Sequence, residues 1–117
     1  MRRAYRRRRK AEKKTPRLGR MTTFAVIYKY EADSEKITEI RPKHREFLGQ
    51  LKQEGKLVGS GPFTDGDGGA LIVIRLPEPA SLDDAIALMD TDPFFVGGAL
   101  EGRAFHTWDP VLNIWDA

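Results

Sequence analysis

Hydrophobic and polar positions along the chain predict four strands. Residues 22–30 (TTFAVIYKY) are β-branched and aromatic without a breaker, which indicates a strand buried along most of its length. Residues 56–60 (KLVGS) predict a short second strand, and residues 70–76 (ALIVIRL) predict the strongest strand of the chain. Between these two lies a glycine-rich loop at residues 61–69, and a fourth strand is expected at residues 101–109.

The first helix is predicted between the first two strands. Pro42 is unfavourable inside a helix, so we expect a short turn up to Arg41 and a main helix that begins at Pro42. Gly55 is expected to end this helix. The apolar residues that share one helical face are Ile37, Ile40, Phe47, Leu48 and Leu51.

The second helix follows the prolines that close the strongest strand. Ser81 and Asp84 have the spacing of a capping box. The inner face of this helix is predicted to consist of Leu82, Ala85, Ile86 and Met89. Further on, Asp92 precedes Pro93 and Phe94, a sequence typical of a helix cap and the first positions of one more helical turn.

The resulting order, β-α-β-β-α-β, predicts an α+β domain of the ferredoxin-like type at residues 21–117. Both helices then cover one face of a four-stranded antiparallel sheet. Alternation along the strongest strand places Ile72 and Ile74 on one face and Leu71 and Val73 on the other. Because both faces are apolar, the second must also be covered, and we expect a homodimer joined sheet to sheet.

Charge separates the first twenty residues from the rest of the chain. Residues 1–20 hold eleven Lys/Arg and one Glu, whereas residues 21–117 hold nine Lys/Arg and sixteen Asp/Glu. The formal net charge of +3 therefore averages a basic segment and an acidic domain. An acidic domain is not expected to hold nucleic acid with its own surface.

The basic segment has too little apolar content to offset its ordering entropy, so we expect a disordered extension. Two interpretations of it stay open. Clustered Arg and Lys are typical of an arm that binds RNA, DNA or an anionic membrane. Alternatively, translation starts at Met21, directly before the first strand, and residues 1–20 are upstream sequence.

Composition argues against several kinds of site. The chain has no cysteine, which excludes disulfides, thiol chemistry and cysteine-based zinc sites. With only His44 and His106, a histidine-rich metal site is not expected, and we expect neither a metal nor a cofactor. His106, in the fourth strand, is expected to pack or to face a cleft wall. No apolar run approaches the roughly 20 residues that span a bilayer and no secretory signal is evident, which favours a cytoplasmic protein without a membrane partner.

Several short segments stand in a characteristic order along essentially all of residues 21–117. They are FAVIYKY, Arg41-Pro42-Lys43-His44, Phe47-Leu48, Leu51, Gly55-Lys56-Leu57, Gly61-Pro62, Asp92-Pro93-Phe94, Gly98 and Trp108. Taken together, these segments resemble the YCII-related (YciI-like) domain family. The resemblance implies a dimeric α+β barrel akin to muconolactone isomerase. Most such proteins have no assigned reaction, and a minority are linked to dehydrochlorination in the breakdown of chlorinated aromatics.

The resemblance implies an acid-base pair formed by His44 of the first helix and Asp92 of the DPF segment. Histidine titrates near neutrality and can move a proton, and a carboxylate that accepts its other ring N–H would fix the tautomer. Arg41 could hold an anionic or phenolic substrate oxygen, and Gly61 and Pro62 are expected to form another wall of the cleft. The chemistry implied is of the dehydrochlorinase, isomerase or lyase type on a small molecule.

A purely structural interpretation of these residues stays open. His44 lies on the same helical face as the apolar residues and could be a half-buried histidine with no functional role. Asp92 could serve only as a helix cap. Arg41 could simply pair with Glu35 or Glu39 on the surface. On this interpretation the protein is a non-catalytic dimeric module that binds a metabolite or accompanies a larger protein.

Overall fold

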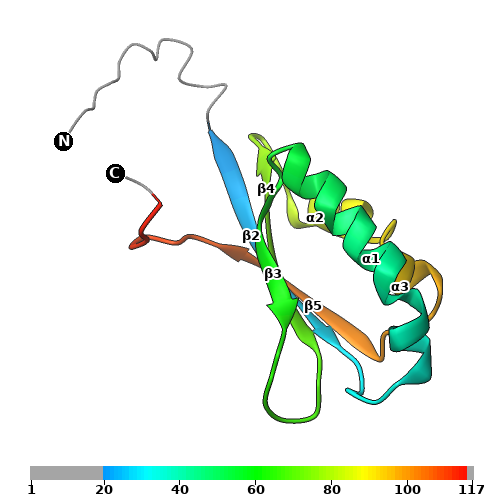
Figure 1. The fold of residues 1–117 in the computed structure, drawn as a ribbon. Coiled ribbons are helices and arrows are strands. Elements are labelled where there is room, and N and C mark those ends of the chain that lie inside the picture. The colour runs from blue at the N-terminus through cyan, green and yellow to red at the C-terminus, as the bar shows by residue number, and fades with distance from the viewer. Residues whose placement is uncertain (1–19, 116–117) are drawn as a thin grey trace.

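A computed structural model describes residues 20–115 of the chain (Figure 1). The predictions of a disordered basic extension and of its nucleic-acid binding fall on residues 1–20, of which residues 1–19 lie outside the described residues. The elements in chain order are β2 (Met21–Lys29), α1 (Glu35–Gln53), β3 (Leu57–Pro62), β4 (Ala70–Pro77), α2 (Leu82–Met89), α3 (Pro93–Val96) and β5 (Gly102–Trp108).

The four strands form one antiparallel sheet in the order β3-β4-β2-β5. The first strand, β2, therefore lies in the middle, with Phe24 opposite Ile74 of β4 and Thr107 of β5. The predicted order of strands and helices is confirmed, with the short α3 as one additional helical turn. This arrangement is compatible with a ferredoxin-like fold.

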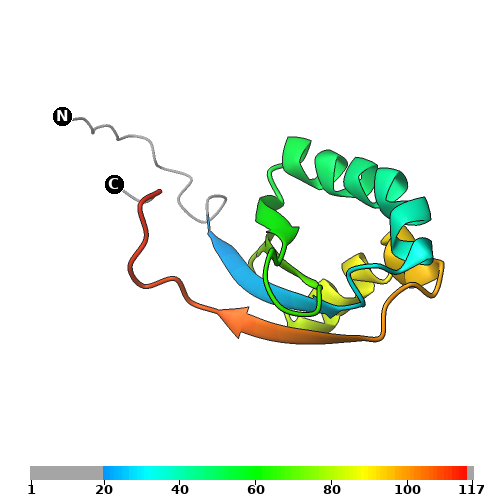
Figure 2. The same cartoon turned by 60° about the horizontal axis from the view of Figure 1, so that its bottom comes forward.

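The helices lie together on one face of the sheet, and none of the helices formed by residues 20–115 lies on the other face (Figure 2). Strand side chains that point toward the helices form the core, because alternate residues of a strand face the same way. The core residues with 0 or 1% exposure are Phe24, Val26, Tyr28, Ile37, Ile72, Ile74, Ala85, Met89 and Phe94.

The prediction that the main helix begins at Pro42 is wrong. Instead, α1 is one continuous helix in which the side chain of Ser34 caps the N–H of Ile37, and Pro42 lies in the interior. Proline removes one backbone hydrogen bond from the helix. The helix continues through this gap because buried side chains on both sides of it, Ile37 before and Leu48 after, pack against the sheet.

The cap of α2 agrees with the prediction. Ser81 accepts a hydrogen bond from the N–H of Asp84, and the Asp84 carboxylate accepts one from the N–H of Ser81, which completes the capping box. The second strand is longer than predicted and ends at Pro62 rather than at Ser60. This extension matters because it carries Gly61 and Pro62 along the edge of the sheet as part of β3.

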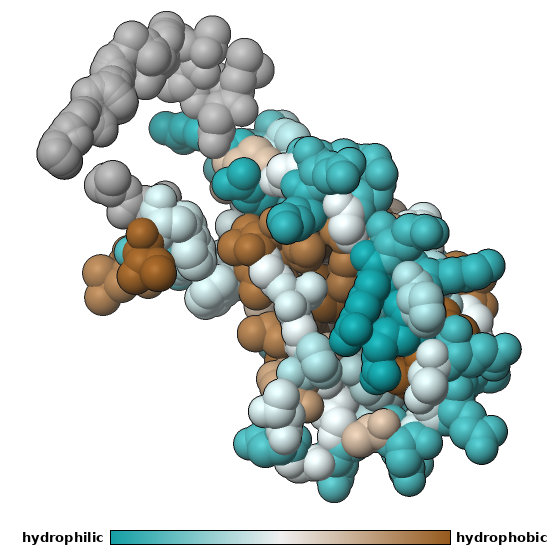
Figure 3. All heavy atoms as spheres, in the orientation of Figure 1, coloured by the Kyte–Doolittle hydropathy of each residue, from teal (hydrophilic) through white to brown (hydrophobic). Residues whose placement is uncertain are grey.

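The face of the sheet without helices is apolar and partly exposed. Figure 3 shows hydrophobic side chains along the sheet near β3 and on the C-terminal segment. The outer-face and C-terminal side chains with 37% exposure or more are Ile27, Val58, Phe63, Leu71, Trp108, Val111, Leu112, Ile114 and Trp115. The expected cover for this face, a second copy of the chain, stays a prediction.

Candidate active site

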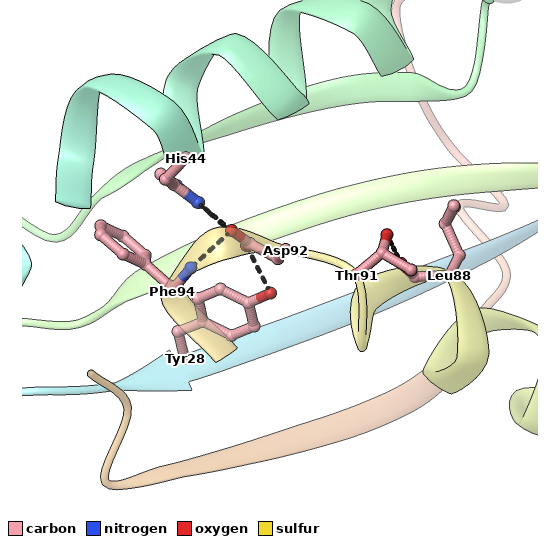
Figure 4. Close-up of polar contacts among 6 residues, drawn as sticks. All are labelled: Tyr28, His44, Leu88, Thr91, Asp92 and Phe94. Carbon is pink, nitrogen blue, oxygen red and sulfur yellow. Dashed lines mark hydrogen bonds and ion pairs between the residues drawn. The ribbon is translucent and has the colours of Figure 1, made fainter. Parts of the chain in front are cut away.

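A buried histidine of α1 contacts a buried aspartate at the start of α3. His44 is 5% exposed and Asp92 is 0% exposed. The His44 Nδ1 atom lies 2.9 Å from each carboxylate oxygen of Asp92 (Figure 4). The two residues are 48 positions apart, so the packing of α3 against α1 brings them together. A carboxylate in this position accepts the Nδ1–H and leaves Nε2 as the ring nitrogen available to a ligand.

Asp92 makes two further hydrogen bonds that fix its position. It is the N-cap of α3, where Oδ1 accepts the N–H of Phe94 at 3.0 Å. Its Oδ2 atom accepts the hydroxyl of Tyr28 at 2.7 Å (Figure 4). Three donors from three different segments therefore converge on one buried carboxylate, which offsets the cost of burying its charge.

Phe94 covers one face of the His44 ring. The two rings are stacked, with centroids 3.9 Å apart and an interplanar angle of 13°. The Tyr28 ring lies on another side, tilted by 45° at 6.2 Å from the imidazole. The imidazole is thus held by a hydrogen bond at one edge and by aromatic packing around it.

A glycine permits the close approach of α3 to α1. Gly97 is the C-cap of α3, and a Cβ at this position would lie 2.6 Å from Cδ1 of Ile40 and 3.0 Å from the carbonyl oxygen of Pro93. A side chain at residue 97 would displace the end of the Ile40 side chain and crowd the Pro93 carbonyl oxygen. Glycine at this position therefore favours the close packing of α3 against α1.

The hydroxyl of Tyr28 belongs to the site, although the analysis of the sequence did not single it out. Burial, followed by the negative charge of Asp92, raises the pKa of Tyr28 well above its ordinary value, and nearby Arg103 opposes this shift. Tyr28 therefore remains a neutral donor to the carboxylate. A signal was present in the sequence, since Tyr28 alternates with buried Phe24 and Val26, and a buried tyrosine hydroxyl needs a partner.

A cleft of about 270 Å³ opens beside His44, between α1 and the β3–β4 edge of the sheet. Three residues expected at the site, Arg41, Gly61 and Pro62, line this cleft together with His44. The sequence analysis did not identify the other lining residues, which are Tyr30, Arg45, Leu48, Ser60, Ala70, Ile72 and Phe94. Asp92 does not line the cleft, but its carboxylate is hydrogen-bonded to two residues that do, His44 and Phe94.

Other candidate features lie elsewhere. The expectation for His106 is wrong, because it is exposed and does not line the cleft: alternation along β5 turns it away from the helices. Larger hollows of about 860 and 460 Å³ lie against β3 and the Trp108 end of β5, and neither contains a histidine. Within residues 20–115 there is no group of three His, Asp or Glu side chains that could hold a metal ion, and no helix is long and apolar enough to cross a membrane.

Comparison with known proteins gives a family, a relative and a structural neighbour. Residues 21–109 match the family model of the YCII-related domain. The uncharacterized protein YjpA of Bacillus subtilis (strain 168) is 38% identical over 58 residues, which cover 50% of this chain and 64% of that protein, less than two thirds of its length.

One structural neighbour is 5-chloro-2-hydroxyhydroquinone dehydrochlorinase (TftG) from Burkholderia phenoliruptrix AC1100, solved in complex with 2,5-dihydroxybenzoquinone. It aligns with a TM-score of 0.58 at 19% identity, over 74% of this chain and 93% of its own. At this identity the likeness supports a shared fold.

Proposed function

Because the chain belongs to the family of YCII-related domains, we propose that it binds a small molecule beside His44 and carries out acid-base chemistry with His44 and Asp92. The reaction is of the dehydrochlorinase, isomerase or lyase type. One observation carries the proposal: the imidazole that lines the cleft is bonded through Nδ1 to a fully buried carboxylate. A histidine held in this way has one free nitrogen and a defined direction for proton transfer.

Each residue of the cluster has a separate role in the proposal. His44 is the group that exchanges a proton with the ligand through Nε2. Asp92 holds the tautomer and supports the imidazolium that forms when His44 takes a proton. Tyr28 does not face the ligand, because its hydroxyl donates to Asp92, and it acts as a positioning residue. Gly61 and Pro62 form the opposite wall.

The reaction of the structural neighbour supplies a specific form of this chemistry to test. In a dehydrochlorination of a phenol such as 5-chloro-2-hydroxyhydroquinone, one hydroxyl group first takes its keto form, and its proton moves to the ring carbon that carries chlorine, which becomes saturated. Nε2 of His44 would then take the proton of another ring hydroxyl. The electrons of that O–H bond would form a carbonyl group, the adjacent ring double bond would shift to the chlorinated carbon, and the C–Cl bond would break as chloride leaves. The proton on the imidazolium then passes to solvent through the open side of the cleft, and the product is a quinone formed without an external oxidant.

The test is chloride release from 5-chloro-2-hydroxyhydroquinone by purified full-length protein. We expect His44→Gln to lower kcat by about 10²- to 10⁴-fold, because it removes the general base. Lys43→Gln is the matched control, since residue 43 is exposed on the same helix and does not line the cleft. Turnover by His44→Gln at the wild-type rate would refute the proposed role of the histidine.

A second candidate function is a non-catalytic module that binds a metabolite or accompanies a larger protein. It is favoured by the bonds of Asp92, which caps α3 and accepts from Tyr28 in addition to its contact with His44, so the carboxylate has a structural role of its own. Ligand binding without turnover, unchanged in His44→Gln, is the result expected from this alternative.

We also propose that two copies pair through the outer face of the sheet, which would complete a dimeric α+β barrel. The exposed apolar side chains of this face, among them Leu71 and Trp108, support the proposal because isolated proteins rarely leave such a patch uncovered. The cleft lies on the helix side, so pairing would leave it open to ligands.

A further inference from the structure

Two arginines line the His44 cleft one helical turn apart. Arg41 and Arg45 both belong to α1, and residues at this spacing are neighbours on one helix face. Neither guanidinium makes an ion pair or a hydrogen bond with any residue in the described part of the chain, so the alternative pairing of Arg41 with Glu35 or Glu39 is not formed there. Like charges at this spacing destabilise a helix.

The position of the two cations is unusual for this domain. Residues 21–117 carry nine Lys/Arg against sixteen Asp/Glu, so acidic partners are abundant on the surface. Two other arginines of the folded domain do have partners: Arg103 donates to Asp90 at 2.7 Å, and Arg75 donates to the carbonyl oxygen of Gly55 at 2.8 Å. The guanidinium groups of Arg41 and Arg45 occur together at the cleft, where a ligand could supply an acceptor.

The remainder of the cleft wall is largely apolar. Leu48, Ala70, Ile72 and Phe94 contribute hydrocarbon surface, and the volume of about 270 Å³ is near the lower end for ligand pockets. A space of this size suits a single ring or a short carbon chain. Arginine recognises carboxylates through two parallel N–H···O bonds, a geometry that a neutral group does not satisfy.

We propose that the cleft selects a small organic acid, with its carboxylate held between Arg41 and Arg45 and its apolar body beside His44. Arg45 is then a substrate-binding residue in addition to Arg41. This inference rests on the proposed function, because it names the class of molecule that the histidine would act on. The anionic end is fixed at the mouth of the cleft, and the carbon that exchanges a proton lies deeper, toward Nε2 of His44.

The test uses benzoate as the probe and the uncharged benzamide as its comparison, with binding to the full chain followed by the NMR shift of the Gly61 amide in the cleft wall. We expect benzoate to bind at least about tenfold more tightly than benzamide. Arg41→Gln and Arg45→Gln should each weaken benzoate binding about tenfold and leave benzamide binding unchanged. Added salt should weaken binding of benzoate alone.

Lys43→Gln is the matched control, because it removes the same charge from an exposed position between the two arginines that does not line the cleft. It should keep benzoate affinity within about twofold, since an exposed charge outside the site is screened. Equal affinity for benzoate and benzamide, no benzoate-dependent shift of Gly61, or an equal loss in Lys43→Gln would overturn the inference.

The outcome is separable from that of the proposed function. If benzoate binding depends on both arginines but the protein shows no turnover, the proposed carboxylate site is supported and the proposed reaction is refuted. If turnover depends on His44 but Arg41→Gln and Arg45→Gln leave benzoate binding unchanged, the acid-base proposal is supported and the proposed carboxylate site is refuted.

Discussion

The two faces of the sheet are built from the same strands but differ in the burial and polarity of their side chains. On β2, Tyr28 faces the helices with 1% exposure, whereas its neighbour Ile27 faces outward with 39% exposure. The inner face contains the buried His44, Asp92 and Tyr28, which are hydrogen-bonded to one another, and the outer face contains exposed apolar side chains. Alternation along a strand separates these properties within a single residue step.

The difference indicates how a small domain can accommodate both a site and an interface. Buried polar groups such as Asp92 need partners from several elements, which only the helix-covered face provides. An apolar face needs only another apolar surface. Substitutions on the outer face should therefore affect the association of the proposed dimer. Substitutions on the inner face should affect the free energy of unfolding and the proposed reaction.

The largest effect is expected from Leu71→Lys on the outer face. In the proposed dimer this change would bury an unpaired charge in each subunit, which should weaken association by about a thousandfold, or about 4 kcal/mol. Leu82→Lys is the control, because Leu82 is equally exposed, 38% against 37%, but begins α2 on the helix side. Sedimentation at several concentrations measures both, and a wild-type protein that is monomeric at micromolar concentration would contradict the proposed pairing.

A smaller but substantial loss is expected from Asp92→Ala on the inner face. The change leaves the Tyr28 hydroxyl and the Phe94 N–H without their acceptor, so the free energy of unfolding should fall by about 3 kcal/mol. Asp84→Ala is the control, since it removes the exposed capping box of α2 and should lower the same quantity by about 1 kcal/mol. Equal urea midpoints for the two variants would show that the buried hydrogen bonds contribute nothing beyond a cap.

The smallest effect is expected from Tyr28→Phe, about 1 kcal/mol near neutral pH, because one buried hydrogen bond is lost. This variant also tests the raised pKa of Tyr28. In the unfolded chain the phenol loses its proton near pH 10, whereas the fold retains it, so the wild-type free energy of unfolding should fall as the pH rises above about 10.

Urea unfolding between pH 8 and pH 11 measures this dependence, which Tyr28→Phe should reduce by up to about 1.4 kcal/mol per pH unit. Tyr30→Phe is the control, because the Tyr30 hydroxyl makes no hydrogen bond within residues 20–115. If the free energy of unfolding falls equally with pH in wild-type protein and in Tyr28→Phe, the raised pKa of Tyr28 is refuted.

Local patterns were sufficient to predict the elements of this fold and two of its caps. Runs of β-branched, aromatic and other apolar residues identified the strands, and the spacing of Ser81 and Asp84 identified the start of α2. The same local reasoning failed at Pro42, because the helix continues through the proline for reasons of tertiary packing. Propensity describes one segment at a time, and packing against the sheet can override it.

The site was less accessible to local reasoning. His44, Asp92 and Tyr28 come from three separate segments, and no spacing within any one segment relates them. The family resemblance, now confirmed over residues 21–109, pointed to the first two, and their contact required the fold. Arg45 was missed because an exposed arginine on a helix has no distinctive pattern until the wall of the cleft is known.

The stacking of Phe94 on His44 has a stereochemical consequence. Phe94 covers one face of the imidazole and Asp92 occupies Nδ1, so a proton can pass only along the ring plane at Nε2. A ligand anchored by its carboxylate as proposed would present one face of its reacting carbon to this nitrogen. Proton exchange at a prochiral carbon would then be stereospecific, and turnover in deuterium oxide would label one of the two enantiotopic positions.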